Sequence, residues 1–287
     1  MRCETMNLIL GHNQFIGISH ISEERSRERE KRFSDVKNIY NVVEKAADLG
    51  YKEMIIETHP RMLKFLEYYK NNRTFDTVFY LQVPYVQGYI QKMNEKGIPG
   101  LVTEITQRSG FKTVFNMALK NMIPLAKKDY LSIATSVLQL EITPFMDVEI
   151  KAILLHNIVT DLLLSLQTAD VFNKYISYVE NERGLKPGFI TLNFQLFKNS
   201  FEKWGIKPPL VMTPINPAGY DMNPSKQVVE AAVKKYKGEV IAMNILGGGA
   251  FSVNEAYSYL KLFDNIKSCA VGASSEKHLR ELKEVFL

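Results

Sequence analysis

The segment IKAILLHNIVTD, residues 150–161, joins an apolar run of strand length to a polar end and a helical pattern. The apolar run stops at His156 and Asn157. A short continuous apolar run favours a strand that is buried on both faces, as is typical of parallel sheets. Seven further segments have this form, namely residues 7–10, 53–60, 77–85, 187–194, 208–216, 239–249 and 268–275.

Segments of helical period follow most of these runs. In residues 35–50 the positions that share one helical face are apolar, and Gly50 stands where the helix should end. These apolar positions are Val36, Ile39, Val42, Val43 and Ala46. Alternating strands and helices require right-handed parallel crossovers, and eight such units close most economically into a barrel. We therefore predict an α/β fold, a single (β/α)8 TIM-barrel domain over residues 1–287, with a doubly wound open sheet as the alternative.

Residues 86–149 are more numerous than one crossover needs. Residues 101–123 and 126–142 have helical patterns within this stretch. We expect a helical insertion between the third and fourth strands. It would either cover one side of the barrel or close over a substrate.

The composition is that of a soluble globular protein, with 46% hydrophobic and 23% charged residues in a chain of 287. A net charge of +5 indicates a mildly basic surface that favours anionic ligands. The sequence has no zinc-finger spacing, no continuous basic helix and no basic stripe interleaved with aromatic residues, so we expect no nucleic-acid partner.

Cys3 and Cys269 are the only cysteines, and we find no secretory leader, which favours a cytoplasmic location. No apolar stretch reaches the roughly 20 residues that a membrane span needs, so we expect no membrane partner. The oligomeric state stays open.

A charge run, SEERSREREKR, occupies residues 22–32. Such a run is usually the solvated face of a helix. The alternative is a loop after the first strand that places Arg25, Arg27 or Arg29 over the barrel mouth to bind a carboxylate or phosphate.

Polar residues end nearly every predicted strand, and the active sites of TIM barrels lie at these carboxyl ends. The residues are His12, Asn13, Glu57, His59, Gln82, His156, Asn157, Asn193, Asn216, Asn244, Ser274 and Ser275. A lone buried histidine is more often a core residue, but several ionisable groups on one rim would be expensive to bury without a role. The predicted catalytic group is therefore His156, Glu57, His59, His12 and Gln82.

The order of several short motifs resembles the aldo-keto reductases. The motifs are LILGHNQFIG, AADLGYKEMIIET, LLHN, GFITLNF, INP, NILGGG and AVGASSEKHLREL. The resemblance covers most of the chain except residues 86–149, and it rests on the order and spacing of the motifs. It implies a barrel enzyme that acts on a small carbonyl or sugar-like metabolite with NADP.

The resemblance assigns an incomplete catalytic tetrad. His156 matches the tetrad histidine, Glu57 falls at the aspartate, and Gln82 falls near the lysine. No tyrosine matches the family's proton donor, and Tyr85 and Tyr220 are rim candidates by position only.

The resemblance also implies cofactor residues. Asn193 matches a residue that binds the nicotinamide amide, the Leu246–Gly249 turn would lie beside the pyrophosphate, and the start of the last helix would hold the adenosine phosphate. The full set is Asn193, Asn244, Leu246, Gly247, Gly248, Ser274, Ser275, Lys277 and Arg280. Met212 and Met243 depart from the family, which has a glutamine and a stacking aromatic ring there.

Two other functions remain open. In one, the rim carries out acid–base chemistry as a lyase, isomerase or hydrolase, with or without a divalent metal ion. The metal ligands would be His12, Glu57, His59 and His156, since Glu57 and His59 would share one face of a strand. In the other, the barrel is a non-catalytic binding subunit.

Overall fold

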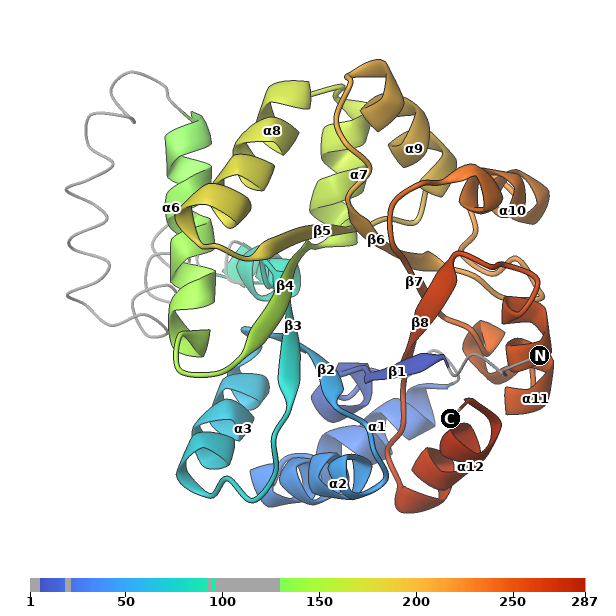
Figure 1. Ribbon diagram of the computed structural model, residues 1–287. Helices are drawn as coiled ribbons and strands as arrows, with labels where there is room; N and C mark the ends of the chain where they lie inside the picture. The colour runs from blue at the N-terminus through green and yellow to red at the C-terminus, as the bar shows by residue number, and fades with distance from the viewer. Residues whose placement is uncertain (1–5, 19–21, 92–93, 96–129, 287) are drawn as a thin grey trace.

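Eight parallel strands close into a barrel, which confirms the predicted fold class (Figure 1). Each strand pairs with its neighbours in sequence, and the last strand pairs with the first. The computed structural model describes residues 6–18, 22–91, 94–95 and 130–286. The strands are β1 Asn7–Leu10, β2 Glu53–Glu57, β3 Val78–Val83, β4 Ile150–Leu155, β5 Lys186–Ile190, β6 Leu210–Pro214, β7 Val240–Met243 and β8 Ile266–Val271.

Helices surround the barrel and connect its strands (Figure 1). They are α1 Glu23–Arg32, α2 Val36–Asp48, α3 Pro60–Asn71, α6 Tyr130–Ile142, α7 Asn157–Ser165, α8 Ala169–Ser177, α9 Phe194–Lys203, α10 Lys226–Lys235, α11 Val253–Leu260 and α12 Glu276–Phe286, with short turns η1 Asn13–Ile16, η2 Thr143–Phe145, η3 Tyr178–Glu182 and η4 Gly247–Gly249. In the described part of the chain, no helix is long and apolar enough to cross a membrane.

The strands are apolar on both faces because they separate two apolar layers. Alternate residues such as Ala152 and Leu154 of β4 belong to a cluster that fills the barrel. Their neighbours Ile153 and Leu155 belong to the larger cluster between the barrel and its helices. This double burial explains why the strands read as continuous apolar runs.

Helix α2 shows the expected amphipathic face. Ile39, Val42, Val43 and Ala46 are buried, and Gly50 follows the helix with a φ of +97° that favours glycine. Val36 is only half-buried. The helical period of the sequence therefore identified the packed face of α2.

Most strands end earlier than the sequence predicts, and at three of them a helix cap or a turn begins there. β2 stops at Glu57, and His59 caps α3. β5 stops at Ile190, and Asn193 caps α9. β7 stops at Met243, before a turn that includes three successive glycines with positive φ.

The predicted insertion contains helix α6 and η2, and residues 86–91 are also helical. The predicted helix over residues 101–123 lies outside the described residues. The charge run forms α1, which buries none of its residues, so its prediction as a solvated helix is confirmed for most of its length.

Candidate active site

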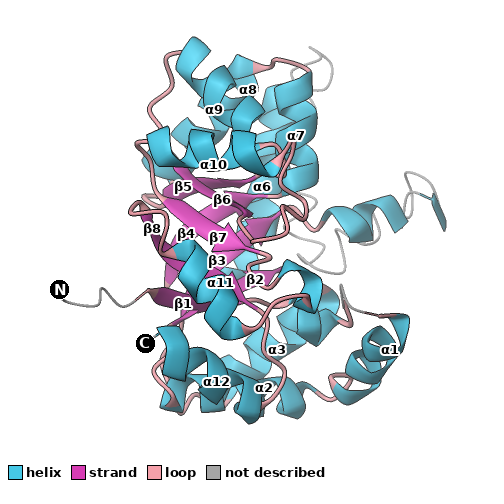
Figure 2. Ribbon diagram, turned by 90° about the vertical axis from the view of Figure 1, so that its right-hand side faces the viewer, coloured by secondary structure: helices cyan, strands magenta, loops and turns pink. Residues whose placement is uncertain are grey.

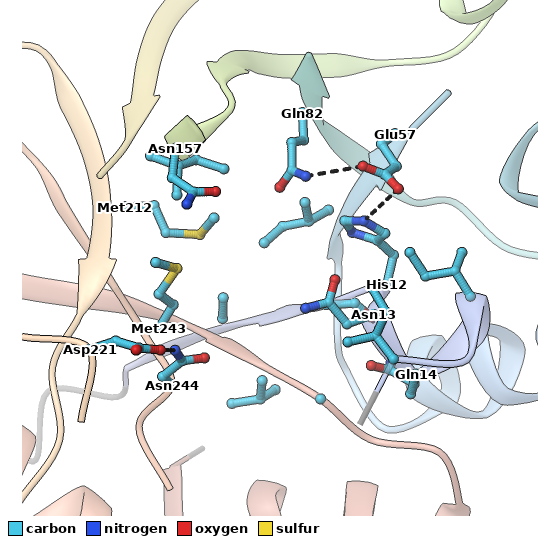
Figure 3. A pocket seen from close by; sticks show the side chains of 18 of the residues that line it. His12, Asn13, Gln14, Glu57, Gln82, Asn157, Met212, Asp221, Met243 and Asn244 are labelled. Atoms are coloured by element: carbon cyan, nitrogen blue, oxygen red, sulfur yellow. Dashed lines mark hydrogen bonds and ion pairs between the residues drawn. The ribbon is translucent and has the colours of Figure 1, made fainter. Parts of the chain in front are cut away.

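A cavity of about 450 Å³ opens at the carboxyl ends of the strands (Figure 3). Isoleucine, leucine and methionine side chains form much of its wall, including Ile55, Ile190, Leu192, Met212 and Met243. Its polar lining includes His12, Asn13, Gln14, Arg29, Glu57, Gln82, His156, Asn157, Asp221 and Asn244. The structure thus brings four of the five predicted catalytic residues into one cavity.

Glu57 and His12 form a buried pair in this cavity (Figure 3). His12 Nε2 lies 3.6 Å from Glu57 Oε1, and the two residues are 3% and 4% exposed. Gln82 Nε2 donates a hydrogen bond of 3.1 Å to Glu57 Oε2. Among the described residues, His12 Nε2 is the only fully buried side-chain nitrogen or oxygen without a hydrogen bond. Unpaired buried polar atoms are rare outside functional sites, so this atom points to chemistry.

The ionisation of Glu57 reflects opposing effects. Burial alone would raise its pKa, but the neighbouring His12 imidazole holds the pKa below its ordinary value. The site therefore keeps a carboxylate beside an imidazole, away from bulk water.

The loop that carries His12 is tied to the opposite side of the β1–β8 seam. Gln14 Nε2 donates to Gly11 O at 2.6 Å and to Ala273 O at 3.2 Å. A Cβ at Gly11 would lie 3.3 Å from Val271 O, so the loop packs closely on β8. These contacts fix the imidazole relative to the strand ends.

His156 occupies the first position after β4 and caps α7. Its Nδ1 accepts a hydrogen bond of 3.1 Å from Ile158 N. Burial lowers the pKa of His156, so the ring is neutral at pH 7 and carries its proton on Nε2. The cap therefore sets the tautomer and leaves Nε2–H as the ring's donor for a ligand oxygen.

His59 does not join the cavity, contrary to the prediction. Its Nδ1 accepts from Arg61 N at 3.1 Å and caps α3, while its ring packs edge-to-face on Tyr85 with centroids 5.2 Å apart. The sequence placed His59 and Glu57 on one face of a strand, but β2 ends at Glu57 and the alternation ends with it. Burial, the largest cause, lowers the pKa of His59 to about 4.

Changing His59 to asparagine should reduce the loss of stability in acid. In the wild type the folded state resists protonation down to about pH 4, whereas the unfolded chain takes up the proton near pH 6.5, so stability falls as pH falls between these values. Asparagine keeps a helix cap but does not titrate. Urea unfolding measures the free energy of unfolding at pH 7 and at pH 4.5. Its fall between these pH values should be smaller in the variant than in the wild type by roughly 1–2 kcal/mol, a figure reduced to allow for solvent screening of the partly exposed ring.

The control for this prediction is His278→Asn, which replaces an exposed histidine of α12. An equal pH dependence in the His59→Asn variant and the wild type would contradict the proposed protonation cost.

The predicted cofactor residues separate into two groups. Asn244, Leu246 and Gly248 line the cavity, and Gly247 precedes Gly248 in the same turn. The others lie off the cavity. Asn193 Oδ1 accepts from Leu196 N as the cap of α9, Ser275 Oγ accepts from His278 N at the start of α12, and Arg280 pairs with Glu276. Ser274 and Lys277 are also absent from the lining.

Sequence reasoning missed Asp221, which accepts a hydrogen bond of 3.0 Å from Asn244 Nδ2 (Figure 3). Both residues have positive φ, 60° and 53°. Asparagine and aspartate tolerate this conformation better than other side chains, and strained backbone often gathers at functional sites. Asp221 lies in a loop well beyond β6, so no strand-end pattern identifies it.

The four proposed metal ligands do not form a site. Within the described ranges, no group of three or more histidine, cysteine, aspartate or glutamate side chains could hold a metal ion. His59 caps α3 outside the cavity, and the three remaining candidates, His12, Glu57 and His156, do not form such a group either.

No tyrosine or lysine is among the described residues that line the cavity. Tyr85 is buried against His59, and Tyr220 is 43% exposed. Neither rim candidate therefore lines the cavity.

Sequence comparisons find no matching family model and no matching curated protein. Structure comparison finds aldo-keto reductases that share this fold. A protein assigned as an aldo-keto reductase from Pseudomonas aeruginosa has a TM-score of 0.57 and 14% identity, over 98% of this chain and 90% of that one. A thermostable aldo-keto reductase bound to the inhibitor epalrestat gives 0.54 and 12%, over 97% and 88%. The aldose reductase of Schistosoma japonicum gives 0.51 and 11%, over 97% and 82%. The resemblance seen in the sequence is thus confirmed at the level of the fold, which this chain shares with the aldo-keto reductases.

Proposed function

We propose that this protein is a diverged oxidoreductase that uses a nicotinamide dinucleotide on a small carbonyl compound. The observation that carries the proposal is the buried His12–Glu57 pair, 3.6 Å apart, in the same cavity as His156. In this proposal the pair takes the place of the family's tyrosine as the source of the proton. The shared fold with aldo-keto reductases favours hydride transfer over other carbonyl chemistry.

The glycine turn supports the proposed binding of a dinucleotide. Gly247, Gly248 and Gly249 have φ values of +54°, +72° and +92°, and a Cβ at Gly247 would lie 3.1 Å from the Phe251 ring. Backbone without side chains allows close approach of a ligand. Asn244, Leu246 and this turn would hold the cofactor, which supplies a hydride when it is bound.

Side chains of the cavity would then stabilise and protonate the carbonyl oxygen of the substrate. His156 Nε2–H donates a hydrogen bond to that oxygen as negative charge develops on it. Protonated His12 delivers a proton to it, and the Glu57 carboxylate balances the charge of the imidazolium. The apolar wall keeps water from the reacting atoms and strengthens both interactions.

A second candidate is cofactor-free acid–base chemistry next to a carbonyl, as in an isomerase or lyase. It is favoured by the position of Ser274, Ser275, Lys277 and Arg280, none of which lines the cavity. The His12–Glu57 pair would then move a proton between substrate atoms.

Dinucleotide binding separates the two candidates. NADPH at about 100 times its Kd should raise the free energy of unfolding of the wild type by about 2.7 kcal/mol, because it binds the folded state only. Gly248→Ala should weaken this stabilisation, because alanine disfavours the φ of +72° that Gly248 adopts in the turn. The matched control is Gly205→Ala, which introduces a side chain at a similar φ of +66° with nothing within 4 Å.

Denaturant unfolding with and without NADPH or NADH provides the measurement. A wild type that responds to neither dinucleotide at millimolar concentration would remove the oxidoreductase proposal and leave the acid–base candidate.

A further inference from the structure

Arg29 is a charged residue of the cavity that the proposed chemistry does not use. It lies on α1 and lines the cavity, half-buried, and its Nη1 donates to Ile18 O at 2.9 Å. The two acidic lining residues have side-chain partners. Glu57 lies beside His12 and accepts from Gln82, and Asp221 accepts from Asn244. Among the residues that the structure describes, Arg29 has no carboxylate partner within ion-pair distance.

Polar contacts hold α1 along its length, and the buried Phe33 that caps it packs on Phe15 at its end. The helix buries none of its residues. Glu30, beside Arg29, pairs with Arg61 of α3, and Arg61 Nη1 also donates to Phe15 O at 2.9 Å. Gly17, whose φ of +83° favours glycine, lies beside the Glu30 carboxylate. These contacts fix the helix where Arg29 reaches the cavity.

The position of α1 matches a role at the barrel mouth. Figure 2 shows α1 projecting from the side of the barrel opposite the N-terminus, where the parallel strands end. It follows β1, whereas the glycine turn follows β7, and β8 separates these two strands in the barrel. Arg29 and the glycine turn therefore reach the cavity from different strand ends.

We propose that Arg29 binds a carboxylate or phosphate group of the substrate, so that the substrate is a small anionic metabolite. This inference rests on the proposed function in taking the cavity as the substrate site. A guanidinium offers a fork of N–H donors that matches either oxyanion, and partial burial strengthens the pairing. The reacting carbon would lie toward His12 and His156, and the anionic group toward α1.

The test compares ligands that differ in one charged group, and its readout is binding, so it needs no hydride transfer. The pairs are glycerol 3-phosphate with glycerol, and 4-hydroxybutyrate with 1,4-butanediol. Calorimetry on the full chain should show that the wild type binds the charged member of at least one pair about tenfold or more tightly. Arg29→Gln should weaken binding of that charged member by about 10- to 100-fold and leave the neutral member unchanged.

Two further variants keep the result interpretable. Arg27→Gln removes an exposed arginine from the same helix and should bind both members as the wild type does. Arg29→Lys keeps a positive charge and should retain part of the preference. Circular dichroism should show the same helix content and melting temperature in the two glutamine variants.

Three outcomes would overturn the proposal. The first is a wild type without preference for either charged probe, and the second is a preference that survives in Arg29→Gln. The third is an Arg29→Gln variant that loses affinity for NADPH and keeps its preference for the charged probe, since Arg29 would then serve the dinucleotide. The protein could also bind neither NADPH nor NADH and still prefer the charged probe through Arg29. That result would support the anionic substrate and remove the oxidoreductase proposal.

Discussion

Replacing Glu57 with glutamine is expected to lower kcat/KM for a small anionic aldehyde by roughly 100- to 10,000-fold, the range of general acid–base catalysis. Glutamine keeps the size of the side chain and can still accept the hydrogen bond from Gln82. It removes the negative charge that lies 3.6 Å from His12 Nε2 and that the proposed proton transfer requires. Steady-state kinetics from pH 5 to 9 would measure the loss.

A double-mutant cycle with His12→Asn tests whether the two residues act as one unit. If they do, the double variant should lose about as much activity as either single variant, because groups that act together are not additive. The control is Glu141→Gln, which neutralises another buried carboxylate outside the cavity that accepts from Tyr85 N at 3.2 Å. It should lower stability and leave kcat nearly unchanged. Full activity of the Glu57→Gln variant would eliminate the proposed proton relay.

Replacing Phe189 with alanine is expected to lower the free energy of unfolding by about 3–5 kcal/mol. Phe189 on β5 is 0% exposed and packs against four aromatic rings with centroids 5.1–5.6 Å away. These rings belong to Phe172, Tyr175, Phe197 and Phe201. The variant loses the transfer energy of a buried ring and leaves a cavity that helices α8 and α9 can close only in part.

Urea unfolding at pH 7 measures this effect. Leu262→Ala, at a side chain that is 61% exposed, is the control and should change stability by no more than about 0.5 kcal/mol. The loss of stability in Phe189→Leu should lie between those of Phe189→Ala and Leu262→Ala, because leucine fills part of the cavity. A loss below about 1 kcal/mol for Phe189→Ala would mean that the aromatic cluster repacks.

The barrel could be predicted because the burial of both strand faces produces continuous apolar runs within single segments of the sequence. The strand at 150–155 lies between the barrel interior and the helices, so nearly all of its residues are apolar. The strand ends could be predicted less well. His59 and Asn193 each cap a helix that starts within three residues of the strand, and the sequence does not show whether such a residue continues the strand or begins the helix.

The candidate site could be predicted only in part. Parallel strands end on one rim, and this rule alone predicts that Glu57, Gln82 and His156 lie together. The strand-end pattern does not encode the insertion, the cofactor or the substrate. Asn193 and Arg280 matched family positions in sequence, yet one caps α9 and the other pairs with Glu276.

By itself, the sequence determined the order of strands and helices, the closed barrel and the rim where the polar strand ends meet, because each follows from apolar periodicity along the chain. Tertiary structure alone decided which rim residues face one another. It set His12 against Glu57, turned His59 away to cap a helix, and brought Arg29 to the cavity from a helix that buries nothing. The reason is that side-chain direction beyond a strand depends on caps, loop anchors and ion pairs between residues far apart in the chain, and no local pattern encodes these.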